Sequence, residues 1–107
     1  MTGYNGPPPG VHDLSERFER PAKYLFVLHA EASALGHAAR NGVSMADCTM
    51  YVTHFCCNEC SKLIIASGIR KIKYGSGTTS MPPELFEASK AMLHEAGVTT
   101  KMIAEEC

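Results

Sequence analysis

The order of helix-forming and strand-forming stretches along the chain predicts an α/β fold. Residues 29–40 are mostly helix formers, with five alanines and one leucine, and Asn41-Gly42 supplies a stop signal. A second helix is predicted over 57–67, with Leu63 and Ile64 on its apolar face. A third is predicted over about 84–96, because Pro82-Pro83 suits a first helical turn. Its packed side is expected to hold these residues: Leu85, Ala88, Met92 and Ala96.

Three short stretches between and after these helices predict strands. Residues 49–53 alternate and are rich in β-formers, 69–74 place Ile72 and Tyr74 on one face, and 98–103 follow the stop signal at Gly97. The order is helix, strand, helix, strand, helix, strand. Such alternation predicts parallel strands joined by crossover helices, and hence an α/β sandwich.

The start of the chain predicts a loop and no targeting segment. Residues 1–10 are rich in Gly and Pro and lack the basic start and apolar run of a secretory signal. No stretch of about 18 apolar residues is present, so no membrane span is expected. A chain of 107 residues predicts one domain over 1–107. We therefore expect a cytoplasmic protein, in the producing cell or in a host cell.

The charge balance argues against binding to long nucleic acids. Ten Lys and Arg oppose 11 Asp and Glu, for a formal net charge of −1. A nonspecific DNA or RNA binder needs clustered basic residues to neutralise phosphates.

The cysteines add a candidate function, because their spacing predicts a metal site. The chain has five: Cys48, Cys56, Cys57, Cys60 and Cys107. The number is odd and three are clustered, whereas a secreted disulfide framework is even and spread out. In a reducing compartment such a cluster predicts a metal site first.

Two short motifs at predicted helix starts combine into a candidate zinc site. They are His29-Ala30-Glu31 and Cys57-Asn58-Glu59-Cys60. Residues three apart on a helix share a face, so Cys57 and Cys60 can point at one spot. With His29 they make three zinc ligands, which leaves a fourth position for water. Glu31 lies two residues from His29, where it can move protons without binding the metal.

These motifs and their flanks resemble a known family. His-Ala-Glu followed by a helix that starts with Cys-x-x-Cys is typical of zinc-dependent cytidine and deoxycytidylate deaminases. The loop at 3–10, the strand at 50–55 and the turn at 67–71 are similar to those of the deoxycytidylate deaminases in particular. The resemblance covers nearly the whole chain. It implies a three-layer α/β/α cytidine-deaminase-like sandwich.

The resemblance also implies a reaction and its residues. His29, Cys57 and Cys60 would bind zinc. Glu31 would pass a proton from water to the ring nitrogen and then to the departing amine, so that deoxycytidylate loses ammonia and becomes deoxyuridylate.

Three substrate contacts are implied as well. The N–H of Ala30 would hold the ring carbonyl, a carbonyl near Phe55 would accept from the amino group, and Asn5 would contact the sugar. The substrate would be a nucleotide monophosphate and the protein a homo-oligomer. Members of the family normally begin with a helix and a strand before the glycine-proline loop, so we expect an N-terminally truncated fold here.

Two positions depart from the family's pattern. Cys56 stands where proline is usual, and Ser33 stands where asparagine is frequent. We prefer Cys57 and Cys60 as ligands, because Cys56 and Cys60 are four apart and break the family spacing. Two other functions stay open: a non-catalytic zinc-binding domain or oligomer subunit, and deamination of another aminated base or nucleoside.

Overall fold

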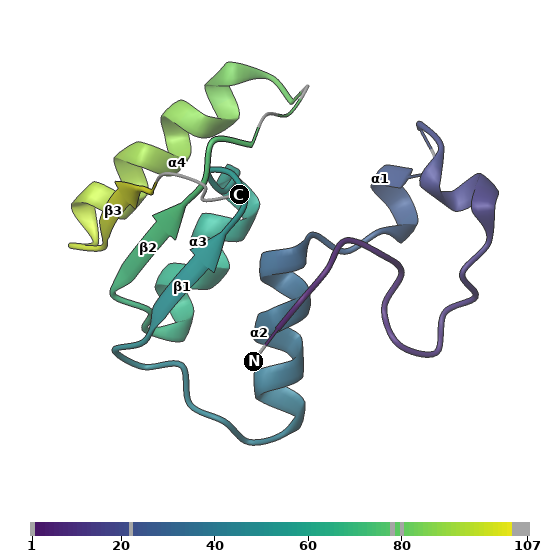
Figure 1. Ribbon diagram of the computed structural model, residues 1–107, viewed down its shortest axis with the longest axis horizontal. Helices are drawn as coiled ribbons and strands as arrows, with labels where there is room; N and C mark the ends of the chain where they lie inside the picture. The colour runs from purple at the N-terminus through teal and green to yellow at the C-terminus, as the bar shows by residue number, and fades with distance from the viewer. Residues whose placement is uncertain (1, 22, 78, 80, 104–107) are drawn as a thin grey trace. The chain divides into compact units, whose positions relative to one another are not determined.

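The computed structural model describes residues 2–21, 23–77, 79 and 81–103. The chain divides into two compact units, 1–43 and 44–107 (Figure 1), and each is described by itself. The prediction of one domain over 1–107 stays a prediction.

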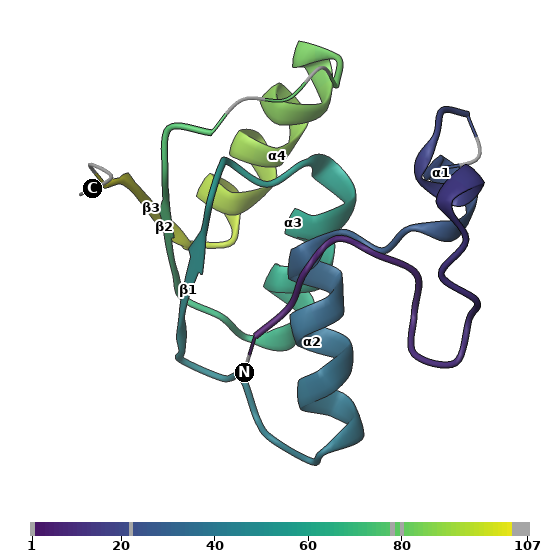
Figure 2. The same cartoon turned by 45° about the vertical axis from the view of Figure 1, so that its right-hand side comes forward.

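The first unit is built around one helix. Its elements are the 3-10 helix η1 (Ser15–Phe18) and the helices α1 (Lys23–Phe26) and α2 (Ala30–Arg40). The N-terminal segment runs beside the first turns of α2 (Figure 2), and Gly6 pairs with Leu28 in an isolated antiparallel bridge. The prediction of a helix over 29–40 is confirmed. The one-turn helix α1 was not predicted, because four residues show no helical periodicity.

The second unit alternates strands and helices as predicted. Its elements are β1 (Thr49–Val52), α3 (Asn58–Ser67), β2 (Lys71–Tyr74), α4 (Pro83–Glu95) and β3 (Thr99–Met102). The strands form one parallel sheet in the order β1-β2-β3, with Met50 opposite Ile72 and Ile72 opposite Thr100. The predicted α/β class with parallel strands is confirmed.

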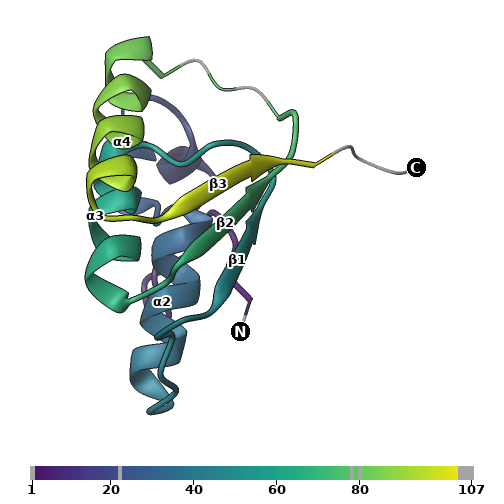
Figure 3. The same ribbon diagram turned by 90° about the vertical axis from the view of Figure 1, so that its left-hand side faces the viewer.

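Both helices of the second unit cover the same face of the sheet (Figure 3). Each follows a strand and returns to the next strand in the same direction, and right-handed crossovers of this kind place successive helices on one side. The buried side chains gather between these layers. They include Met50, Ile64, Ile72, Leu93 and Val98.

The packed faces of α3 and α4 differ in part from the predicted ones. Ile64 is fully buried, but Leu63 is 48% exposed. On α4 the buried residues are Ser89 and Leu93, whereas Ala88 is exposed. A helix on a flat sheet buries a narrow stripe, and a neighbouring residue points about 100° away from it. The positions of the apolar residues alone therefore did not predict which side of each helix is buried.

Gly68 ends α3 in a conformation that favours glycine. Its φ is 87°, and its N–H donates to the carbonyl of Ile65 at 3.1 Å. A Cβ at this position would lie 3.2 Å from the Cα of Ala46. The end of α3 at Gly68 therefore has both a conformational and a steric cause.

In the part of the chain that the structure describes, no helix combines the length and the apolar character needed to cross a membrane. The helix α4 has 13 residues, whereas a span needs about 20.

The contrast between Ile64 and Leu63 gives a test of the packing. Ile64→Ala should lower the free energy of unfolding by about 2–5 kcal/mol, because it leaves a cavity between α3 and the sheet. Leu63→Ala, the neighbouring control on the same helix, should cost less than about 1 kcal/mol. Urea unfolding followed by circular dichroism measures both, and equal losses would contradict the assignment of the buried face.

Candidate metal centre

Two thiols of the second unit meet at the start of α3. Cys57 is the N-cap residue, with φ −77° and ψ 174°, and Cys60 lies in the first turn. Their side chains are 3% and 2% exposed, and the two sulfurs lie within 4.8 Å of each other. The spacing of three residues brings both sulfurs to one side of the helix start, as predicted.

This pair has the chemistry and spacing that a zinc ion requires. Tetrahedral zinc with Zn–S bonds of about 2.3 Å holds two sulfurs about 3.8 Å apart, which small side-chain rotations can reach from the observed spacing. The position also favours the thiolate form, because a helix N-terminus carries partial positive charge. The two thiols at the start of α3 therefore fit a zinc ion.

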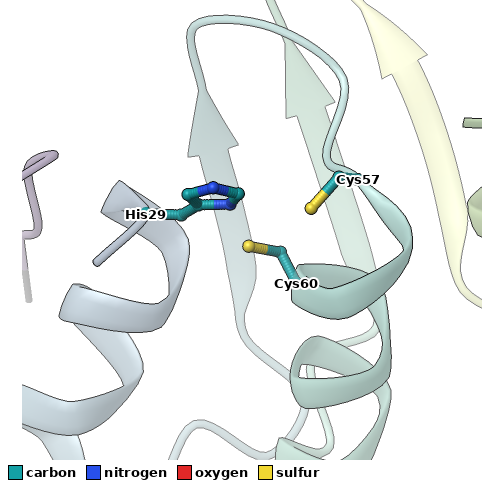
Figure 4. A group of neighbouring side chains, drawn as sticks. All are labelled: His29, Cys57 and Cys60. Carbon is teal, nitrogen blue, oxygen red and sulfur yellow. The ribbon is translucent and has the colours of Figure 1, made fainter. Parts of the chain in front are cut away.

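His29 offers the third candidate ligand, from the N-cap position of α2. Figure 4 shows its ring with the two cysteine side chains. Each of the three residues offers one ligand atom, and these atoms all lie within 4.8 Å of one another. One imidazole nitrogen and two thiol sulfurs form a donor set that zinc accepts, and three protein ligands are the number found in catalytic zinc sites.

The remaining cysteines are placed differently. Cys56 is fully buried, and its sulfur lies 3.7 Å from the hydroxyl oxygen of Ser89 on α4. Cys48 is half-buried, and Cys107 lies outside the described residues. The contact with Ser89 was not predictable, because the two residues are 33 positions apart and serine carries no signal for a buried position.

Glu31 lies in the first turn of α2, two residues after His29. Its side chain is only 8% exposed, which is rare for a carboxylate. The partial positive charge of the helix N-terminus compensates in part for this burial. A buried carboxylate beside a candidate ligand fits the predicted proton-transfer role.

Asn5 and Ala30, both predicted substrate contacts, are hydrogen-bonded to each other. The N–H of Ala30 donates to Oδ1 of Asn5 at 2.8 Å. Sequence reasoning assigned each residue to the substrate and missed this bond between them. No local signal points to it, because the residues are 25 positions apart.

Phe55 lies in the loop between β1 and α3 and is half-buried. Its ring makes an edge-to-face contact with Tyr74, with centroids 4.9 Å apart. Its carbonyl oxygen lies 3.0 Å from Nδ1 of His54. A carbonyl has two lone pairs, so this oxygen can still accept a second hydrogen bond.

Ser33 lies one helical turn after His29, and its N–H donates to the carbonyl of His29 at 2.9 Å. It lines a hollow of about 290 Å³ within the first unit, together with Tyr4, His37 and Arg40. Neither His29 nor Glu31 lines that hollow.

Comparison with known proteins identifies the family. Residues 1–76 match the family model described as the cytidine and deoxycytidylate deaminase zinc-binding region. The chain belongs to this family. The matched range contains all seven predicted site residues: Asn5, His29, Ala30, Glu31, Phe55, Cys57 and Cys60.

Individual relatives agree with this assignment. The chain is 36% identical to deoxycytidylate deaminase of Homo sapiens over 98% of its length, and 38% identical to that of Mus musculus over 91%. It spans 61% and 56% of these two relatives. A crystal structure of dCMP deaminase from the cyanophage S-TIM5, in complex with dCMP and dUMP, aligns with a TM-score of 0.71 and 30% identity. That match covers 94% of this chain and 70% of the other, and it confirms the predicted α/β fold with parallel strands and flanking helices.

The ligand assignment predicts which thiols a bound metal needs. Zinc-loaded protein should hold about one zinc per chain, and Cys57→Ser or Cys60→Ser should reduce this toward zero, because each removes one of three ligands. Cys56→Ser and the control Cys48→Ser should retain the metal. Elemental analysis after dialysis measures all four, and loss of zinc in Cys56→Ser with retention in Cys57→Ser would overturn the assignment.

Proposed function

We propose that this chain is a zinc-dependent hydrolase that converts deoxycytidylate and water to deoxyuridylate and ammonia. One observation carries the proposal. A His-Cys-Cys donor set for zinc occurs in the same chain as a buried carboxylate, Glu31, two residues from the histidine ligand. Family membership and relatives named deoxycytidylate deaminase support the choice of substrate.

The residues present fit a zinc ion, with His29, Cys57 and Cys60 as its ligands. When bound, zinc would act as a Lewis acid that lets water serve as the nucleophile near neutral pH. The chain itself would supply three ligands, which leaves the fourth position of the zinc ion for solvent.

Glu31 would carry the protons of the reaction. Its carboxylate would accept a proton from the attacking water and deliver it to the ring nitrogen next to the amino-bearing carbon. It would then pass the water's second proton to the amine, which leaves as ammonia when the carbon–nitrogen bond breaks.

Substrate contacts are proposed at Asn5, Ala30 and Phe55. The carbonyl of Phe55 would accept from the amino group of the base, and its second lone pair remains for His54. The N–H of Ala30 would donate to the ring carbonyl. Because this N–H has one hydrogen and already donates to Asn5, the substrate would share it with Asn5 or take it over.

The proposed partners are limited to the substrate and further copies of the chain. A homologous structure holds dCMP and dUMP, which supports a nucleotide monophosphate as the ligand. Homo-oligomer formation stays a prediction, as does the cytoplasmic location.

The role of Glu31 can be tested by one amide substitution. Glu31→Gln should lower kcat for deoxycytidylate by about 100- to 10,000-fold, because the amide cannot move protons, while the zinc content stays unchanged. Ammonia release measures the rate. Glu59→Gln is the matched control, since Glu59 lies in the first turn of α3 but is exposed and paired with Lys62.

Two outcomes would count against the proposal. Equal rates for Glu31→Gln and the unmodified chain would remove Glu31 from the mechanism. Tight zinc binding without turnover of cytidine, deoxycytidine or their monophosphates would favour the non-catalytic zinc domain instead.

A further inference from the structure

The two helices that carry candidate ligands start in an unusual way. The N-cap residue of a helix normally accepts a hydrogen bond from an N–H of the first turn through its own side chain, and Ser, Thr, Asp and Asn do this best. The N-cap residue of α2 is His29, whose side chain makes no capping bond. A ring that serves as a metal ligand cannot also cap its helix.

An acceptor for this helix start comes from a distant part of the first unit. Oδ1 of Asn5 accepts the N–H of Ala30, the first residue of α2, at 2.8 Å. Asparagine is a strong capping residue because its side-chain carbonyl reaches backbone N–H groups. Asn5 therefore caps the start of α2, where the side chain of the N-cap residue His29 makes no capping bond.

The residues around Asn5 hold it in this position. Gly6 exchanges two backbone hydrogen bonds with Leu28, with N···O distances of 3.2 and 2.7 Å. Gly3 packs so closely on α2 that a Cβ there would collide with the carbonyl oxygen of Ala30 and lie 2.5 Å from the nitrogen of Ala34. We call these three residues, Gly3, Asn5 and Gly6, the N-terminal clamp.

The clamp fixes the backbone on both sides of His29. Leu28 is tied through its N–H and its carbonyl, and Ala30 is tied through its N–H. The dihedral angles of His29, φ −70° and ψ 152°, are thereby confined, and with them the direction of its Cα–Cβ bond. Outer-shell groups that hydrogen-bond to a metal ligand commonly change metal affinity by about 10- to 100-fold, and we expect a group that acts through the ligand's backbone to lie at the lower end of that range.

We propose that Asn5 is a positioning residue, which caps α2 in place of His29 and so orients His29 and Glu31 before substrate binds. This goes beyond a sugar contact, because it uses the acceptor oxygen of Asn5 and leaves its amide NH₂ as the donor for the substrate. The proposal rests on His29 being a zinc ligand, as proposed above, but not on turnover.

The test separates the two ends of the Asn5 side chain. Asn5→Asp keeps the acceptor oxygen and removes the donor, whereas Asn5→Ala removes both. Asn5→Ala should weaken zinc binding by about tenfold, measured by competition with a chromophoric chelator, and should speed hydrogen exchange at the amide of Ala30, measured by NMR. Asn5→Asp should stay within about twofold of the unmodified chain in both measurements and should raise KM.

Asn41→Ala is the matched control. Asn41 lies at the other end of α2, and its side chain donates to the carbonyl of His37, also at 2.8 Å. This substitution should leave zinc affinity and the exchange rate at Ala30 unchanged. If Asn5→Ala does not fold, Asn5→Ser, whose hydroxyl oxygen lies one bond closer to the backbone than Oδ1 of asparagine, takes its place with the same expectation.

The outcomes separate this proposal from the proposed function. Unchanged zinc affinity and unchanged exchange at Ala30 in Asn5→Ala would overturn the positioning role. A raised KM in both Asn5 variants with normal zinc binding would leave a substrate contact only. A protein that binds zinc in the predicted way but releases no ammonia would sink the proposed reaction and leave the positioning role supported.

Discussion

The N-cap position is the constraint on which the site depends. His29 and Cys57 are the N-cap residues of α2 and α3, and neither side chain makes a capping hydrogen bond to its own helix. This placement brings partial positive charge to the candidate ligands and favours anionic thiolates and a nearby carboxylate. It also leaves the helix starts in need of other partners, and for α2 the structure shows one in Asn5. The glycine-proline loop is therefore part of the site's framework.

The second unit supports its candidate ligands in a different way. The loop that leads from β1 to Cys57 passes through Cys56, which is buried against Ser89 of α4, and the helix that follows is anchored by Ile64 beneath it. The deaminase motif P-C-x-x-C has proline just before its first cysteine, where a fixed φ restrains the start of the helix. In this chain the same position is Cys56, and its side chain contacts Ser89 of α4 instead. The packing of α4 is thereby connected to the start of the helix that carries the candidate ligands Cys57 and Cys60.

Much of this arrangement was predictable from the sequence, and the reasons are local. Alanine-rich and proline-initiated stretches gave α2 and α4, alternating β-formers gave β1 and β2, and motif spacing brought Cys57 and Cys60 together. What escaped prediction depends on distant partners. Leu63 and Ile64 are equally apolar, and only the sheet beneath decides which is buried. The bond between Asn5 and Ala30 and the contact between Cys56 and Ser89 join residues whose types fit many local roles. The four residues of α1 are too few to show periodicity.

If two helix N-cap residues and one first-turn cysteine hold a single zinc ion, a fourth position stays open for water. X-ray absorption spectroscopy at the zinc edge, on protein loaded with one equivalent, measures this ligand set. Two sulfur ligands at about 2.3 Å and two nitrogen or oxygen ligands at about 2.0–2.1 Å are predicted, with one of the latter showing the multiple scattering of imidazole. Three or four sulfur ligands, or the absence of imidazole scattering, would contradict a His29, Cys57 and Cys60 zinc site.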